Sequence, residues 1–204
     1  QSNVDAILDA GGIASINHPN FRWAFDHRSI IQVTGAKLME IYNGHPATNT
    51  YGGLGKFSCE EMWDQILTAG KSIFGVATDD SHNYHDFEPK RSNPGRGWIV
   101  VHAYKLSTDS ICNALSSGEF YASTGVTLHK LEVSQRSISL EIEKDRFSLR
   151  CRLPEGEIPQ AMALIVNKTT INQLTKTNLS KNLSLKIPLL SSAMDTVTES
   201  KMAI

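Results

Sequence analysis

The sequence lacks several features that would point to a membrane, a nucleic acid or a disulfide-rich protein. It has no run of about 18 consecutive apolar residues, which excludes an ordinary membrane-spanning helix. Its first residues show no basic segment followed by an apolar stretch, so we expect no signal peptide. A formal net charge of −1 gives neither nucleic acid nor an anionic membrane surface an attractive field. The three cysteines are widely spaced and form no CxxC pair, which argues against a disulfide framework and a thiolate zinc site. We therefore expect a cytoplasmic protein.

The composition is that of a globular protein with a real core. Apolar residues make up 40% of the 204 positions and charged residues 20%. Residues 1–125 alternate short apolar runs with amphipathic stretches. Helices are expected over residues 3–10, after Ser58 and after Ser107, and strands over residues 12–17, 37–42, 72–77 and 98–103. Helices interleaved with non-alternating apolar strands predict an α/β domain with a parallel sheet.

Two further regions follow this α/β domain. Residues 126–170 contain short, partly alternating runs separated by polar turns, which predicts a small antiparallel β appendage. Residues 171–204 are poor in charge and rich in Ser, Thr, Asn and Leu, and they form a third region.

Polar side chains follow three of the predicted strands. His18 comes after the first strand, Glu40 and Asn43 lie in or just after the second, and Asp80 and His82 follow the third. In parallel α/β architectures, the carboxyl ends of neighbouring strands collect functional groups. Imidazole and carboxylate are ligands that Zn, Mn or Fe accepts without a thiolate.

The spacing of Asp80 and His82 supports a shared role if the chain is still extended there. Residues i and i+2 of an extended chain point to the same side, so both side chains would face one cavity. The alternative is that Asp80-x-His82 forms a helix cap or a turn, and for His18 the alternative is a turn before Pro19.

Two further residues are candidates for substrate contact. Arg96 lies between two glycines, where a guanidinium could hold a phosphate or carboxylate with paired hydrogen bonds. A surface arginine in a flexible loop is the alternative. His85 follows the Asp80-x-His82 pair closely and is a second candidate at the mouth of the site.

Residues 1–125 resemble the second half of the PHP (polymerase and histidinol phosphatase) family of metal-dependent hydrolases. The resemblance is carried by AGGIASINHPNF, LMEIYNG, GVATDDSH, GRGWIVV and SICNALSSGEFYASTG, in this order, with a β tail to about residue 167. It implies part of a distorted seven-stranded β/α barrel with metal ions at the carboxyl ends of its strands.

The resemblance also implies the chemistry. His18, Asp80 and His82 would be metal ligands for Zn, Mn or Fe, with Asp80 and His82 catalytic. A metal-bound hydroxide would attack a phosphoester or related ester. Arg96, Asn43, Glu40 and His85 would contact this small anionic ester substrate. The family's remaining ligands lie upstream of what this chain contains, so we expect an incomplete active site and self-association through exposed sheet edges. The alternative is a non-catalytic binding or scaffold remnant of the same fold.

Residues 174–204 resemble a different family, the opening of the IMP dehydrogenase barrel. The resemblance is carried by LTKTNLSKNLSLKIPLLSSAMDTVTESKMAI, and above all by the signature MDTVTE of residues 194–199. It implies that the positions of Ser192 and Met194 approach a nucleotide. Because the glycine-rich phosphate loops and the catalytic cysteine loop of that family are not within these residues, we expect no dehydrogenase activity from this chain as given. An IMP-binding fragment is the third, most distant interpretation.

Overall fold

The computed structural model describes residues 1–133, 137–142, 147–152, 165–166 and 197–199. The helices are α1 (Ser2–Asp9), the 3₁₀-helix η1 (Phe21–Trp23), α2 (His27–Gln32), α3 (Cys59–Thr68) and α4 (Thr108–Ser117). The strands are β1 (Ser15–Ile16), β2 (Leu38–Asn43), β3 (Phe74–Thr78), β4 (Trp98–Val101), β5 (Phe120–Ser123), β6 (Leu128–Val133), β7 (Ser137–Ile142), β8 (Phe147–Arg152), β9 (Ile165–Val166) and β10 (Val197–Glu199). None of the helices within these ranges is long and apolar enough to cross a membrane.

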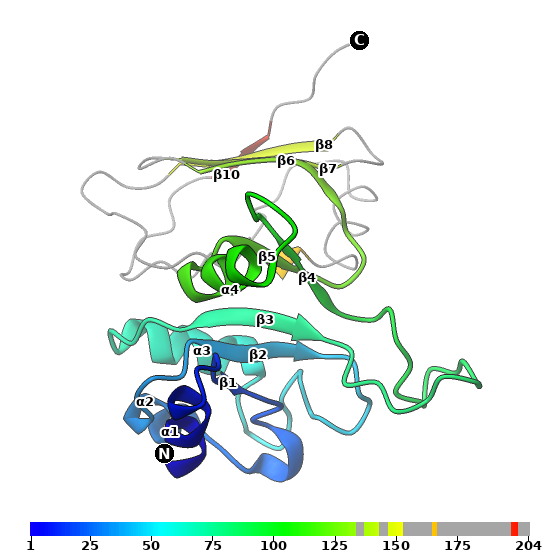
Figure 1. Cartoon of the computed structure of the whole chain (residues 1–204). Helices are drawn as coiled ribbons and strands as arrows, with labels where there is room; N and C mark the ends of the chain where they lie inside the picture. The colour runs from blue at the N-terminus through cyan, green and yellow to red at the C-terminus, as the bar shows by residue number, and fades with distance from the viewer. Residues whose placement is uncertain (134–136, 143–146, 153–164, 167–196, 200–204) are drawn as a thin grey trace.

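The first three strands form a parallel sheet in the order β1-β2-β3. Their carboxyl ends therefore lie at one edge of the sheet, and the segment between β3 and β4 projects beyond that edge (Figure 1). The register of β2 against β3 shifts between Glu40 and Tyr42. Such an irregularity changes the direction of the side chains that follow it.

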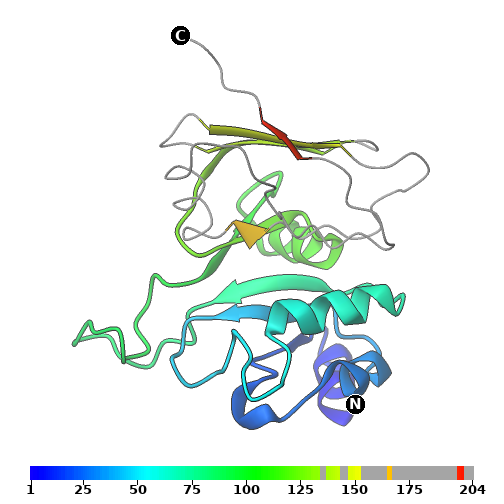
Figure 2. The same cartoon turned by 180° about the vertical axis from the view of Figure 1, so that it is seen from behind.

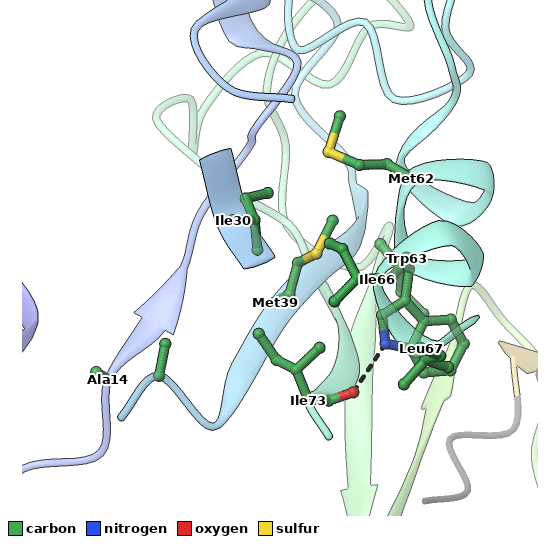
Figure 3. Packing of buried hydrophobic residues seen from close by; sticks show 10 residues of the cluster. Ala14, Ile30, Met39, Met62, Trp63, Ile66, Leu67 and Ile73 are labelled. Carbon is green, nitrogen blue, oxygen red and sulfur yellow. Dashed lines mark hydrogen bonds between the residues drawn. The ribbon is translucent and has the colours of Figure 1, made fainter. Parts of the chain in front are cut away.

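One face of this sheet packs against the helices α2 and α3. Met39 and Ile41 of β2 are fully buried in a cluster with Trp63 and Ile66 of α3. The indole nitrogen of Trp63 donates to the carbonyl of Ile73, at 2.8 Å, so the one polar atom of this side chain is satisfied (Figure 3). This apolar cluster stabilises the sheet that positions the strand ends, and the Trp63 N–H within it is paired.

The opposite face packs against α4 and a second sheet. Leu38, Val76 and Phe120 are buried together there, and β5 pairs with β4 antiparallel. This corrects the sequence prediction in two respects. The strand expected over residues 98–103 does not run parallel to its neighbour, and β5 was not expected. His102, expected inside that strand, follows β4 and is exposed.

The local signals expected at the ends of α3 and α4 are confirmed. Ser58 and Glu61 form the expected capping box at the start of α3, with Ser58 Oγ accepting from the Glu61 N–H at 3.1 Å. Ser107 caps α4, and Gly118 ends it at φ 76°, a left-handed conformation that suits glycine.

A separate antiparallel sheet has the order β10-β8-β7-β6. It lies on the far side of α4 from the parallel sheet (Figures 1 and 2). Short strands from late in the sequence complete two of the three sheets. β9 pairs parallel with β5, and β10 pairs antiparallel with β8. The described strands thus lie in three separate sheets, and the seven-stranded barrel stays a prediction.

Candidate functional site

Glu40 joins the ends of all three parallel strands. Only 4% of its surface is exposed, although it carries a carboxylate. It accepts hydrogen bonds from the backbone N–H of His18 at 2.5 Å, from Asn43 Nδ2 at 2.8 Å and from Thr78 Oγ1 at 2.8 Å. A buried carboxylate needs such donors because it has lost its water. Glu40 is therefore a structural tie, with both oxygens occupied by the protein itself.

Asp80 connects to this tie through Asn43. Asn43 Nδ2, which donates to Glu40, also lies 3.2 Å from Asp80 Oδ2. The Asn43 carbonyl oxygen Oδ1 accepts the backbone N–H of His45 at 2.8 Å. The side-chain amide of Asn43 thus holds the turn at Asp80 and the backbone at His45 in place.

The sequence argument for Asp80 and His82 assumed an extended chain, and this premise is wrong. β3 ends at Thr78, and Asp80 has φ 48°, in the left-handed region. The turn brings His82 Nδ1 to 2.7 Å from the carbonyl oxygen of Asp80 and 3.8 Å from its carboxylate. The two residues do lie close together, but as a local turn with the His82 side chain 64% exposed.

His18 enters the cluster by its backbone. Its N–H donates to Glu40, and its ring lies edge-on to Phe21, with ring centroids 5.5 Å apart. Like Asp80, it has a positive φ, at 30°. This geometry fits the alternative of a turn before Pro19.

The predicted metal ligands lie in the described part of the chain, where their arrangement can be compared with that of a metal centre. Within the described ranges, no group of three His, Cys, Asp or Glu side chains is placed to hold one. His18, Asp80 and His82 are therefore not gathered into the predicted metal centre. The physical reason is that His18 contributes a backbone donor, and His82 Nδ1 contacts the carbonyl of its own turn.

Arg96 and Asp79 hold the projecting loop. Asp79 accepts the N–H groups of three successive residues, 95, 96 and 97, at 2.8, 2.5 and 2.8 Å. The guanidinium of Arg96 donates to the carbonyls of Gly44 at 3.2 Å, Pro89 at 3.4 Å and Glu88 at 2.6 Å. It also donates to Asn93 Oδ1 at 3.0 Å. Both terminal nitrogens of Arg96 therefore donate to acceptors within the protein, and the contact of Arg96 with an anionic substrate stays a prediction.

Sequence reasoning missed two residues near these strand ends. The ring of His45 lies 5.6 Å from that of His82, and Thr78 donates a hydrogen bond to Glu40. Each follows or ends a predicted strand, so position was the available signal. His85, predicted to contact substrate, is exposed on the projecting loop.

Cys59 is not a nucleophile. It is 2% exposed at the start of α3, and burial raises the pKa of its thiol to about 12. A thiol that stays protonated at neutral pH is inert. Cys59 therefore serves as a small apolar side chain in the core.

Comparison with known proteins places the relationship elsewhere in the chain. The family described as IMP dehydrogenase / GMP reductase domain matches residues 158–204. The inosine-5′-monophosphate dehydrogenase of Borreliella burgdorferi is 53% identical over 47 residues, which is 23% of this chain and 11% of that protein. The chain thus spans about a tenth of the length of that curated relative. No solved structure matches.

These findings correct the main sequence prediction. The assignment to the PHP family, the metal-dependent phosphoesterase function and the metal-binding, PHP-type description are wrong, because the matching family is IMP dehydrogenase / GMP reductase. Two of the motifs behind that assignment contain side chains that bond within the protein: Glu40 and Asn43 in LMEIYNG, and Asp79 and Asp80 in GVATDDSH. The matched residues include the MDTVTE signature of residues 194–199.

Proposed function

We propose that residues 158–204 are a segment of an IMP dehydrogenase-type domain and bind a purine nucleoside monophosphate. The observation that carries the proposal is the 53% identity over 47 residues to an inosine-5′-monophosphate dehydrogenase. Identity of that degree over a segment of this length is far more specific than the short motifs at the strand ends. Ser192 and Met194 are the residues that we assign to the nucleotide.

The rest of the chain has a supporting role in this proposal. Two strands of the matched segment are described, and both extend sheets built by earlier residues: β9 pairs with β5, and β10 pairs with β8. Backbone pairing at two points gives the segment a fixed attachment. In this proposal, the α/β region is a scaffold. That role agrees with the hydrogen bonds among Glu40, Asn43 and Asp80, whose polar groups bind one another.

A thermal melt of the full chain with inosine 5′-monophosphate tests the proposal. A ligand that binds only the folded state stabilises it by RT ln(1 + [L]/Kd), about 2.7 kcal/mol at 100 times Kd. We expect a rise in melting temperature that grows with nucleotide concentration. Inosine, which has the same base and ribose but no phosphate, is the matched control ligand.

Two substitutions locate the effect. We expect Met194→Ala to weaken the apparent nucleotide affinity, obtained from the rise in melting temperature, at least tenfold. Ser192→Ala should weaken this affinity less. Ser180→Ala, in the same segment but outside the signature, is the control and should leave the shift unchanged. A shift that survives Met194→Ala at full size would contradict the assignment of the signature.

A further inference from the structure

Among the described strands, β6 forms the longest edge of a sheet. It stands last in the sheet order β10-β8-β7-β6, and the described strand that pairs with it is β7. β6 has six residues, whereas the other described strands at the ends of sheets have two to five. Residues 129–132 are all exposed, so both faces of this stretch are accessible. An exposed edge strand presents backbone N–H and C=O groups with which another strand can pair.

The side chains of this edge carry opposite charges two residues apart. Lys130 and Glu132 point to the same face, because side chains alternate along a strand, and their charged groups lie 2.9 Å apart. Leu131 points to the other face and is 37% exposed. A lysine on an edge strand ordinarily repels a second copy of the same strand. Glu132 supplies the opposite charge, so this edge can be complementary to itself.

The charges select one register for such a self-pairing. A two-fold symmetric antiparallel pair places one residue opposite itself at its centre. A centre at Lys130 or Glu132 would set like charges directly opposite each other, which is destabilising. A centre at His129 would fall within the register shift between Leu128 and Lys130. A centre at Leu131 sets lysine 130 of each copy opposite glutamate 132 of the other.

We propose that β6 pairs antiparallel with the β6 of a second copy of this chain, in the register centred on Leu131. The two sheets would then join into one continuous sheet across the two-fold axis. Lys130 already lies opposite Glu141 of β7 and would gain Glu132 of the second copy on its other side. Acidic and basic side chains would therefore alternate across the joined strands, which stabilises neighbouring pairs. This proposal is independent of nucleotide binding.

Sedimentation velocity of the full chain tests the association. An edge of this length buries little surface, so we expect monomers in dilute solution and dimers that accumulate as the concentration rises. Glu132→Lys sets lysines opposite each other at both symmetric positions and should weaken dimerisation at least tenfold. Lys56→Glu, at an exposed residue between β2 and α3, is the control and should dimerise as the unaltered chain does.

A mixture of two variants separates pairing at β6 from a general effect of charge. Lys130→Glu and Glu132→Lys should each sediment as monomers, and their equal mixture should form a heterodimer, because each opposed pair is again acidic with basic. Lys56→Glu has the same net charge as Lys130→Glu but should form far fewer heterodimers with Glu132→Lys. On β7, position 132 faces Ser139 and position 130 faces Glu141, so a thermal melt of each variant checks that it folds.

Leu131→Cys tests the register directly. In the proposed pair, the two copies of position 131 stand opposite each other, at a separation that a disulfide can span. Oxidised glutathione should cross-link this variant as a dimer, and adding Glu132→Lys should lower the cross-linked fraction. The unaltered chain, oxidised in parallel, controls for its own cysteines. An unaltered chain that stays monomeric up to about 1 mM, dimerisation unaffected by Glu132→Lys, or no cross-link at position 131 would overturn the proposal.

Discussion

Two regions of this chain differ in the kind of information they carry. Residues 1–125 form an α/β unit with a dense set of side-chain hydrogen bonds at its strand ends. The family match falls on residues 158–204, which the structure describes through β9 and β10. Polar residues at the carboxyl ends of the strands look functional in the first region, but there they bond to one another. The difference shows that the types of residue in a cluster do not establish a function until their partners are known.

The largest expected effect concerns the tie at Glu40. Glu40→Ala would leave three donors near the strand ends without their acceptor, and we expect a loss of about 3–5 kcal/mol in the free energy of unfolding. Urea denaturation measures it. Glu132→Ala, at an exposed residue paired with Lys130, should cost less than about 0.5 kcal/mol. A loss at Glu40 as small as that of the control would mean that the tie is not structural.

The next largest loss of stability is expected from the hydrogen bonds of Arg96 in the loop between β3 and β4. Arg96→Ala removes a guanidinium that donates to four acceptors and should lower the free energy of unfolding by about 1.5–3 kcal/mol. Arg91→Ala is the matched control, because Arg91 is exposed and lies 4.0 Å from Asp86. If the two variants were equally stable and only Arg96→Ala lost affinity for an anionic ligand, Arg96 would be a binding residue.

A pH effect is expected from Cys59. Burial raises the pKa of the Cys59 thiol to about 12 in the folded state, from its ordinary value of 9.0 in the unfolded chain, so the folded state holds the proton more tightly. The resulting stabilisation is complete below pH 9 and is lost as pH rises from 9 towards 12, by up to about 1.4 kcal/mol per pH unit. Chemical denaturation at pH 8, 9 and 10 measures this fall. It should be smaller in Cys59→Ala, and an equal fall in both proteins would assign it to other groups.

The smallest effect concerns His82. Its side chain is mostly exposed, so His82→Ala should change the free energy of unfolding by less than about 0.5 kcal/mol. Urea denaturation of this variant beside Glu40→Ala gives the contrast within one cluster. A loss of 2 kcal/mol or more at His82 would show that the exposed turn also supports the fold.

The sequence predicted those parts of the fold that depend on local signals. The capping box at Ser58, the N-cap at Ser107 and the parallel order of the first strands follow from spacing and residue type. The antiparallel pairing of β4 and β5 did not, because both strands are short apolar runs whose direction depends on distant packing.

The candidate site was predictable in its location and not in its chemistry. Strand ends placed Glu40, Asn43 and Asp80 at one edge, and the structure puts them within hydrogen-bond reach. The left-handed conformation of Asp80 and the hydrogen bond from Arg96 to the carbonyl of Gly44, 52 residues earlier, do not follow from the residue types. No local sequence pattern predicts such contacts. The sequence therefore could not distinguish a side chain that binds a metal or substrate from one that bonds only within the protein.

Calorimetric titration of the full chain with inosine 5′-monophosphate tests the central claim most directly. The account predicts saturable binding at one site per chain, lost in Met194→Ala and retained in Glu40→Gln if that variant folds. An absence of binding heat at several temperatures, with the chain folded throughout, would contradict it.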